Sequence, residues 1–139
     1  MIISQLRGRI RTMLKFENPT HYLIVHVGAN DFGILPPGDL GSEIEKNLTL
    51  ISRYHLLGTT IAWSQMLPRF NWRYSSDLVA MERCRYRTNN AVASYVLKYR
   101  GYYIRYPEII RDRSLFEDDG VHLSLVANNI LLNKLHRGI

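Results

Sequence analysis

The sequence predicts a single α/β domain with three layers, in which helices cover both faces of a parallel sheet. The length of 139 residues is that of one domain. Segments rich in Val, Ile and aromatic residues alternate along the chain with segments of helical periodicity, and loops rich in Gly and Pro separate them. Alternation at this spacing is typical of βαβ crossovers between parallel strands.

Residues 1–16 have the pattern of an amphipathic helix. Leu6, Ile10 and either Met13 or Leu14 recur at helical spacing and would form one apolar face. The segment is basic and contains no acidic residue, which is also typical of a mitochondrial presequence. We favour a helix of the domain, because the apolar pattern continues into the next segment without a linker.

The next segments read as a strand, a loop and a helix. Residues 21–27, HYLIVHV, predict a strand buried on both faces, because the run is short, rich in Val, Ile and Leu, and does not alternate. Gly and Pro predict a loop over 28–39, at the end of which Asp39 is a candidate helix N-cap. The helix should end near Leu57 and Gly58, and its buried face should contain Leu40, Ile44, Leu48 and Ile51.

The second half repeats this order. Residues 59–64 predict a second strand and 65–76 a long loop, after which Ser75, Ser76 and Asp77 offer capping side chains. A helix should run to about Tyr99 and stop at Gly101. The residues expected near one side of this helix are Leu78, Met81, Val92, Tyr95 and Tyr99. Residues 102–106 predict a third strand, 107–120 a loop, and 123–136 a final helix.

Composition excludes several classes of protein. The chain is 46% hydrophobic and 22% charged, which is typical of a globular rather than a disordered chain. Its single cysteine, Cys84, excludes an intramolecular disulfide and a cysteine-based zinc cluster. No apolar run approaches the roughly 20 residues that cross a bilayer, and no signal peptide is visible. We therefore predict no membrane span and favour an intracellular location.

The net charge of +6 comes largely from arginine. Many of these arginines fall in the second half of the chain, at Arg69, Arg73, Arg83, Arg85, Arg87, Arg100, Arg105, Arg111 and Arg113. Such a surface could bind the phosphates of a nucleic acid. We favour a solvated basic face, because no glycine-rich phosphate loop, zinc-finger spacing or RNA-binding aromatic motif accompanies the charge.

Two polar clusters follow predicted strands, where functional residues gather in parallel sheets. In the first, the Gly28 N–H and the Asn30 amide could donate to one developing oxyanion. In the second, Asp119 could accept from one imidazole nitrogen of His122 and leave the other free as a general base. Each cluster alone is also consistent with ordinary turn chemistry.

Together, the two clusters resemble the SGNH, or GDSL-type, hydrolases. VGAND is similar to the Gly-x-Asn-Asp block of that family, and DGVHLS is similar to its Asp-x-x-His block. The segments WSQMLPR, MERCRYRTNNAVASY and DGVHLSLVANNILLNKL extend the resemblance over essentially the whole chain. They resemble an SGNH-like subfamily found in animal genomes, some members of which are associated with retroelement reading frames.

The resemblance implies a flavodoxin-like SGNH hydrolase fold and hydrolysis of carboxylic esters by a Ser-His-Asp triad. It assigns Gly28 and Asn30 to the oxyanion hole, His122 to the base and Asp119 to its orientation. It implies a small ester or another acylated compound as substrate and no cofactor. A metal site at the clustered His and Asp residues is a weaker alternative, and we predict none.

The sequence departs from the family at the nucleophile. The family's serine lies in a Gly-Asp-Ser block before the Gly-x-Asn-Asp block, whereas the only Gly-Asp dipeptide here, Gly38-Asp39, lies after Asn30 and precedes Leu40. The glycine of a second oxyanion block is also missing, since Gly8 lies inside the helix pattern. We therefore expect a domain over 1–139 that is truncated at its N-terminus and inactive as this chain. An exposed sheet edge should then favour self-association.

Three other polar residues near the strand ends have structural interpretations. Ser64 ends the second predicted strand and is a candidate substitute nucleophile, but a capping role with backbone hydrogen bonds is favoured. Asp31 should tie its own loop together, and His26 should pack in the core. The alternative function is a non-catalytic SGNH-like module that binds nucleic acid or a protein partner through the arginine-rich surface.

Overall fold

The sheet has three strands, all parallel, in the order β1-β2-β3. The computed structural model describes residues 1–18, 21–36 and 38–137. The strands are β1 (Tyr22–Val25), β2 (Thr60–Ser64) and β3 (Tyr102–Ile104). Each lies within a segment predicted to be a strand, and the predicted parallel sheet is confirmed.

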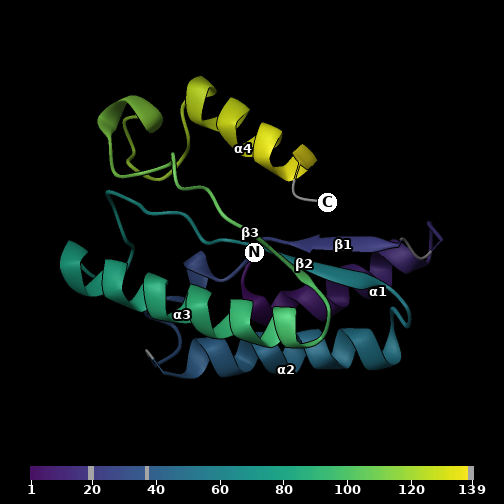
Figure 1. Cartoon of the computed structure of the whole chain (residues 1–139). Helices are drawn as coiled ribbons and strands as arrows, with labels where there is room; N and C mark the ends of the chain where they lie inside the picture. The colour runs from purple at the N-terminus through teal and green to yellow at the C-terminus, as the bar shows by residue number, and fades with distance from the viewer. Residues whose placement is uncertain (19–20, 37, 138–139) are drawn as a thin grey trace.

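Helices cover both faces of the sheet, as predicted. On one side lie α1 (Leu6–Leu14), α2 (Asp39–Tyr54) and α3 (Leu78–Lys98), and on the other side lies α4 (Leu125–Arg137) (Figure 1). Each face has its own core. The larger cluster joins the first three helices to the sheet, and the smaller one joins α4 to β2, β3 and the loop after β3. No helix in the described ranges is long and apolar enough to span a membrane.

The helices begin and end close to the predicted positions. The four apolar residues predicted on the inner face of α2 are all buried, at Leu40, Ile44, Leu48 and Ile51. Asp77 caps α3 as expected, accepting a hydrogen bond from Ala80 N at 3.0 Å. Asp39, by contrast, makes no capping bond, because it is the first residue inside α2 and Gly38 precedes it.

The prediction about the burial of the first strand is wrong. Strand β1 is not buried on both faces: Val25 lies in the core, whereas Tyr22 and Ile24 are exposed. The reason is that β1 is an edge strand, and the core beneath α4 contains residues of β2 and β3 but none of β1. Tyr99, predicted near the same side of α3 as Tyr95, lies past the last turn of the helix and is exposed, and its ring centre is 4.9 Å from that of Tyr95.

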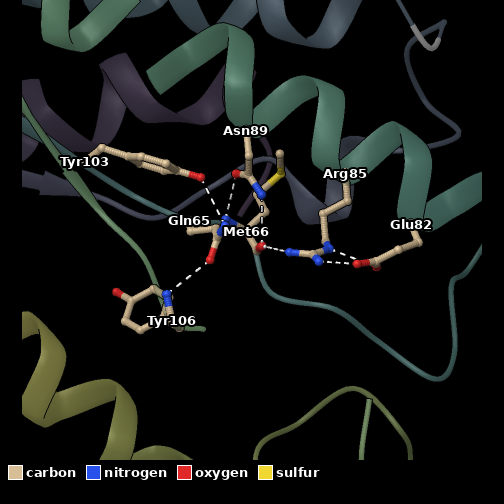
Figure 2. A network of polar contacts seen from close by, with 7 residues as sticks. All are labelled: Gln65, Met66, Glu82, Arg85, Asn89, Tyr103 and Tyr106. Carbon is tan, nitrogen blue, oxygen red and sulfur yellow. Dashed lines mark hydrogen bonds and ion pairs between the residues drawn. The ribbon is translucent and has the colours of Figure 1, made fainter. Parts of the chain in front are cut away.

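A buried asparagine on α3 fixes the chain where it leaves β2. Asn89 Oδ1 accepts from Met66 N at 2.9 Å, and its Nδ2 donates to Met66 O at 3.1 Å (Figure 2). The same Oδ1 also accepts from Trp63 Nε1 at 3.3 Å. Arg85, which is ion-paired with Glu82, donates to the carbonyl of Met66 at 2.8 Å. Helix α3 therefore determines the direction in which residues after Ser64 run.

Strand β3 holds the same segment from the other side. Gln65 donates from Nε2 to Tyr103 Oη at 3.0 Å, and its Oε1 accepts from Tyr106 N at 3.1 Å (Figure 2). The backbone N–H of Gln65 also donates to Ile104 O at 3.0 Å. The first residues of the long loop are consequently anchored on both sides, and the residues that follow them have a defined position at the carboxyl edge of the sheet.

Candidate active site

Gly28 lies just beyond the end of β1 and turns the chain sharply. Its φ of 112° is in the left-handed region that glycine adopts readily. A Cβ at this position would lie 3.0 Å from Met66 Sδ and 3.3 Å from Ile44 Cδ1, so both neighbours would have to shift to accommodate a side chain. The chain then forms a single 3₁₀ turn, Ala29–Asp31, which carries the next two polar residues.

The two polar residues of that turn point to different partners. Asn30 is exposed, and its Oδ1 accepts from Arg69 Nη2 at 3.1 Å. Asp31 is buried and accepts from Ile3 N at 2.9 and 3.2 Å. Burial raises the pKa of Asp31, and the hydrogen bond from Ile3 offsets part of that rise. The Asp31 side chain thus ties the N-terminal segment to the sheet edge. Its backbone ties its own loop together, as predicted, because Asp31 N donates to Gly28 O at 2.9 Å and Asp31 O accepts from Ile34 N at 2.9 Å.

Asp119 and His122 form the expected pair in the turn before α4. Asp119 Oδ1 accepts from Val121 N and His122 N, both at 2.9 Å, and Oδ2 contacts His122 Nδ1. The hydrogen bond with His122 is the main reason that the pKa of Asp119 falls to about 2. The same bond and the carboxylate charge raise the pKa of His122 above its ordinary value. Both side chains are exposed, and the imidazole Nε2 remains available.

A short stretch of the loop after β2 joins the two clusters. Arg69 contacts Asn30, as described above, and the next two residues reach the turn that holds Asp119. Phe70 N donates to Gly120 O at 2.8 Å, and Asn71 Nδ2 donates to Asp119 O at 2.6 Å. Both clusters therefore lie on the same edge of the domain. From the sequence alone, Arg69 is assigned only to the basic surface. Its position in the loop after the second strand is the signal that could have indicated the site.

Ser64 contacts a different histidine from the predicted base. Its Oγ lies 2.8 Å from His26 Nδ1 and 2.5 Å from Tyr106 Oη, and the serine is only 1% exposed. The predicted backbone cap is therefore wrong, since the partners of the hydroxyl are side chains. The prediction that His26 packs in the core is also wrong, because the residue reaches solvent. Protein atoms packed around the ring nevertheless lower the pKa of His26, so it is predominantly neutral at pH 7.

Among the residues that the structure describes, the cluster of three side chains that could ligate a metal ion is exposed. One ligand atom from each of Glu117, Asp119 and His122 lies within 4.8 Å of the others. The weaker metal site considered from the sequence also required His26 and Asp31, which are instead bonded to Ser64 and Ile3. Exposed carboxylates beside a histidine that is already hydrogen-bonded form no enclosed coordination site.

Two cavities differ in their relation to these residues. A cavity of about 490 Å³ lies near the amino end of β2 and is lined by residues such as Thr49, Thr59 and Tyr95, none of them predicted for the site. A cavity of about 430 Å³ is lined by Asn30 and Arg69. We place the candidate site beside the second cavity, despite its smaller volume, because Asn30 lines it together with Arg69, whose loop is bonded to the turn that holds Asp119. Asp119 and His122 themselves do not line this cavity.

Replacing Asp119 by asparagine is expected to lower the pKa of His122 towards the ordinary value, because the raised pKa depends on the carboxylate. NMR titration of the imidazole measures the pKa of His122 in the parent and in the variant. Asp118→Asn is the matched control. In the parent, this raised pKa means that protonated His122 contributes stability below about pH 6.5, and that the contribution disappears as the pH rises through the folded-state pKa. Equal pKa values in the parent and in Asp119→Asn would contradict the assignment.

The comparisons with known proteins extend only to the fold. No protein-family model matches the chain, and no curated protein is similar to it. Among solved structures, a protein named TesA superposes with a TM-score of 0.71 and 14% identity, covering 99% of this chain and 71% of that one. A candidate platelet activating factor from Streptococcus pneumonia superposes with a TM-score of 0.72 and 17% identity, covering 99% and 67%. The chain therefore shares its overall fold with these two proteins, and the predicted α/β class with a parallel sheet is confirmed.

Proposed function

We propose that this chain is an SGNH-like hydrolase module that supplies the base half of an ester-hydrolysing site. The observation that carries the proposal is the Asp119–His122 pair. The carboxylate is held by two backbone N–H groups and in turn holds the imidazole, which leaves Nε2 free to take a proton. Asn30 supplies one oxyanion donor: its Oδ1 is occupied by Arg69, and its Nδ2 keeps two hydrogens for an acyl oxygen.

In this proposal the chain does not turn over esters by itself. A base of this kind acts on a specific hydroxyl, and the sequence contains no Gly-Asp-Ser block. Ser64 does not replace it, because the hydroxyl is buried between His26 and Tyr106 and bonded to both. Gly28 is proposed as the second oxyanion donor through its backbone N–H. The substrate class is a small ester or acylated compound, and the binding of nucleic acid is not favoured.

The arginine-rich surface gives little support to the nucleic-acid alternative. Arg85 is paired with Glu82 and bonded to a backbone carbonyl, and the guanidinium of Arg113 lies 4.1 Å from the centre of the Phe70 ring. Arginines that already contact other protein groups are less available to phosphates than those of a free basic face would be. A binding role of this chain is therefore more consistent with a small ligand at the sheet edge.

The test is an assay of ester turnover with the purified chain. We expect hydrolysis of short-chain aryl esters, measured across a pH range that titrates His122, to equal the rate of His122→Ala within about twofold at each pH. The rate enhancement that an incomplete oxyanion hole can still give is small compared with that of a complete enzyme. Ser64→Ala and His26→Ala should behave in the same way.

Multiple turnovers that one of these substitutions abolishes would contradict this proposal. Loss of turnover with both Ser64→Ala and His122→Ala would identify Ser64 as the nucleophile that the predicted base, His122, activates. Loss with Ser64→Ala and His26→Ala, but not with His122→Ala, would instead identify a separate serine–histidine pair at the ends of β2 and β1.

We also propose that the chain self-associates through β1. Over the described residues this strand pairs with β2 alone, and Ile24 on it is exposed. An edge strand with exposed apolar residues favours pairing with another chain. We expect light scattering to show a mass that rises with concentration, and Ile24→Lys to reduce the rise. Leu57→Lys, at an exposed leucine outside the sheet, should not reduce it. A monomer at every concentration that melts above about 60 °C would contradict this proposal.

A further inference from the structure

Arg69 is a half-buried cation without a carboxylate partner. No carboxylate oxygen lies within ion-pair distance of its guanidinium among the residues that the structure describes. The guanidinium donates to Asn30 Oδ1 and lies 5.1 Å from the centre of the Trp72 ring. Burial lowers the pKa of Arg69, an effect that the charge of Asp119 partly offsets. Since a guanidinium has five N–H donors, most of them remain available to a ligand.

The cavity of about 430 Å³ beside Arg69 has the composition of an anion site. No acidic residue lines it, and a second cation, Arg73, lies on its wall. The residues that matter for recognition are Asn30, Phe32, Ile34, Arg69, Trp72 and Arg73. The polar part of the wall has two guanidinium groups and the amides of Gln5 and Asn30, and the rest is aromatic and aliphatic carbon. Such a wall suits a small molecule with an anionic head and an apolar body.

The contacts of Arg69 hold it in a fixed position. Its loop is anchored at Met66 by α3, and its side chain is bonded to Asn30. The next residue, Phe70, donates its backbone N–H to Gly120 O. A guanidinium held in this way loses little rotamer entropy when it binds, and its planar donors match two oxygens of one head group.

We propose that this cavity binds a small ligand through an oxyanion head group, a carboxylate or a phosphate, which Arg69 and Asn30 contact together. The apolar part of the ligand lies against Phe32, Ile34 and Trp72. This inference deepens the proposed function. It rests on that function only in calling the ligand a substrate or a product. Hydrolysis of an ester releases a carboxylate, and the same two side chains would contact that product or an anionic group of the substrate.

The experiment measures binding and needs no turnover. Phenyl phosphate, benzoate and inorganic phosphate are titrated separately into the full chain at low ionic strength, with calorimetry and amide NMR as readouts. We expect phenyl phosphate or benzoate to bind more tightly than inorganic phosphate, because only the first two carry an apolar body. The difference between phenyl phosphate and benzoate distinguishes the two head groups.

Arg69→Gln is expected to weaken binding of the aromatic anions at least tenfold, which is the scale of a charge-assisted hydrogen bond. Arg69→Lys keeps the charge but not the paired donors, and we expect an intermediate loss. Arg83→Gln removes the same charge from an exposed position on α3 and should change affinity by less than twofold. Circular dichroism checks that each variant is folded, and Arg69→Lys carries the test if Arg69→Gln does not fold.

The outcomes separate this inference from the proposed function. Absence of binding to the parent, or equal losses in Arg69→Gln and Arg83→Gln, would overturn the anion site without any consequence for ester turnover. Conversely, binding that depends on Arg69 would support the site even where the turnover assay contradicts the proposed chemistry. Amide shifts confined to residues 28–34 and 69–73 would place the ligand in the cavity.

Discussion

Replacing Asn89 by alanine is expected to destabilise the domain by about 3 kcal/mol. The side chain is 1% exposed and satisfies Met66 N, Met66 O and Trp63 Nε1. Arg85 still donates to Met66 O in the variant, but two buried N–H groups lose their acceptor. Each buried donor without a partner costs about 1–3 kcal/mol, so the loss of two donors determines the magnitude.

Asn90→Ala is the matched control, since the residue is adjacent on α3 and exposed. Both substitutions replace Asn by a better helix former, so the difference between them isolates the buried contacts. Chemical denaturation should show a change within about 0.5 kcal/mol for Asn90→Ala. A loss below about 1 kcal/mol in Asn89→Ala would mean that the network in Figure 2 does not hold the segment after β2. The phenyl phosphate titration on a folded Asn89→Ala then reports whether Arg69 has moved.

Replacing Gly101 by alanine is expected to destabilise the domain by a similar amount, about 3 kcal/mol, which is the upper range for overpacking. A Cβ at this position would lie 2.3 Å from Val96 Cγ1 and 2.4 Å from Ile61 O. The valine can change rotamer, but the carbonyl belongs to β2 and can move only if the strand moves. The substitution therefore forces apart the end of α3 and the centre of the sheet.

Gly8→Ala is the control, because the same substitution is expected there to stabilise the domain. Gly8 lies inside α1, and a Cβ there would meet no atom within 4 Å. Alanine in place of glycine inside a helix should raise the free energy of unfolding by about 0.5–1 kcal/mol. Thermal or chemical denaturation of both variants checks the pair of predictions. A Gly101→Ala variant as stable as the parent would show that the end of α3 can shift away from β2.

The end of α3 illustrates how far a residue pattern can be interpreted. Gly101 was predicted to stop the helix, and α3 does end just before it, at Lys98. The left-handed residue of the terminating turn is nevertheless Arg100, with a φ of 63°. Gly101 N donates to Val96 O at 2.8 Å and Arg100 N to Leu97 O at 3.2 Å, which is the Schellman arrangement. Glycine is required at 101 because of the close approach of Ile61, a contact that sequence does not reveal.

The sequence by itself determined the parallel sheet, because strand and helix patterns alternate along the chain. It also determined the buried face of α2 and the Asp119–His122 pair, because each of these depends on residues that are close along the chain. Only the tertiary structure decided the partners of Arg69 and Ser64. Arg69 and Asn30 are 39 positions apart, and Ser64 lies 38 and 42 positions from His26 and Tyr106. Such residues meet because parallel strands bring their carboxyl ends to one edge, and local periodicity carries no information about which side chains will face each other there.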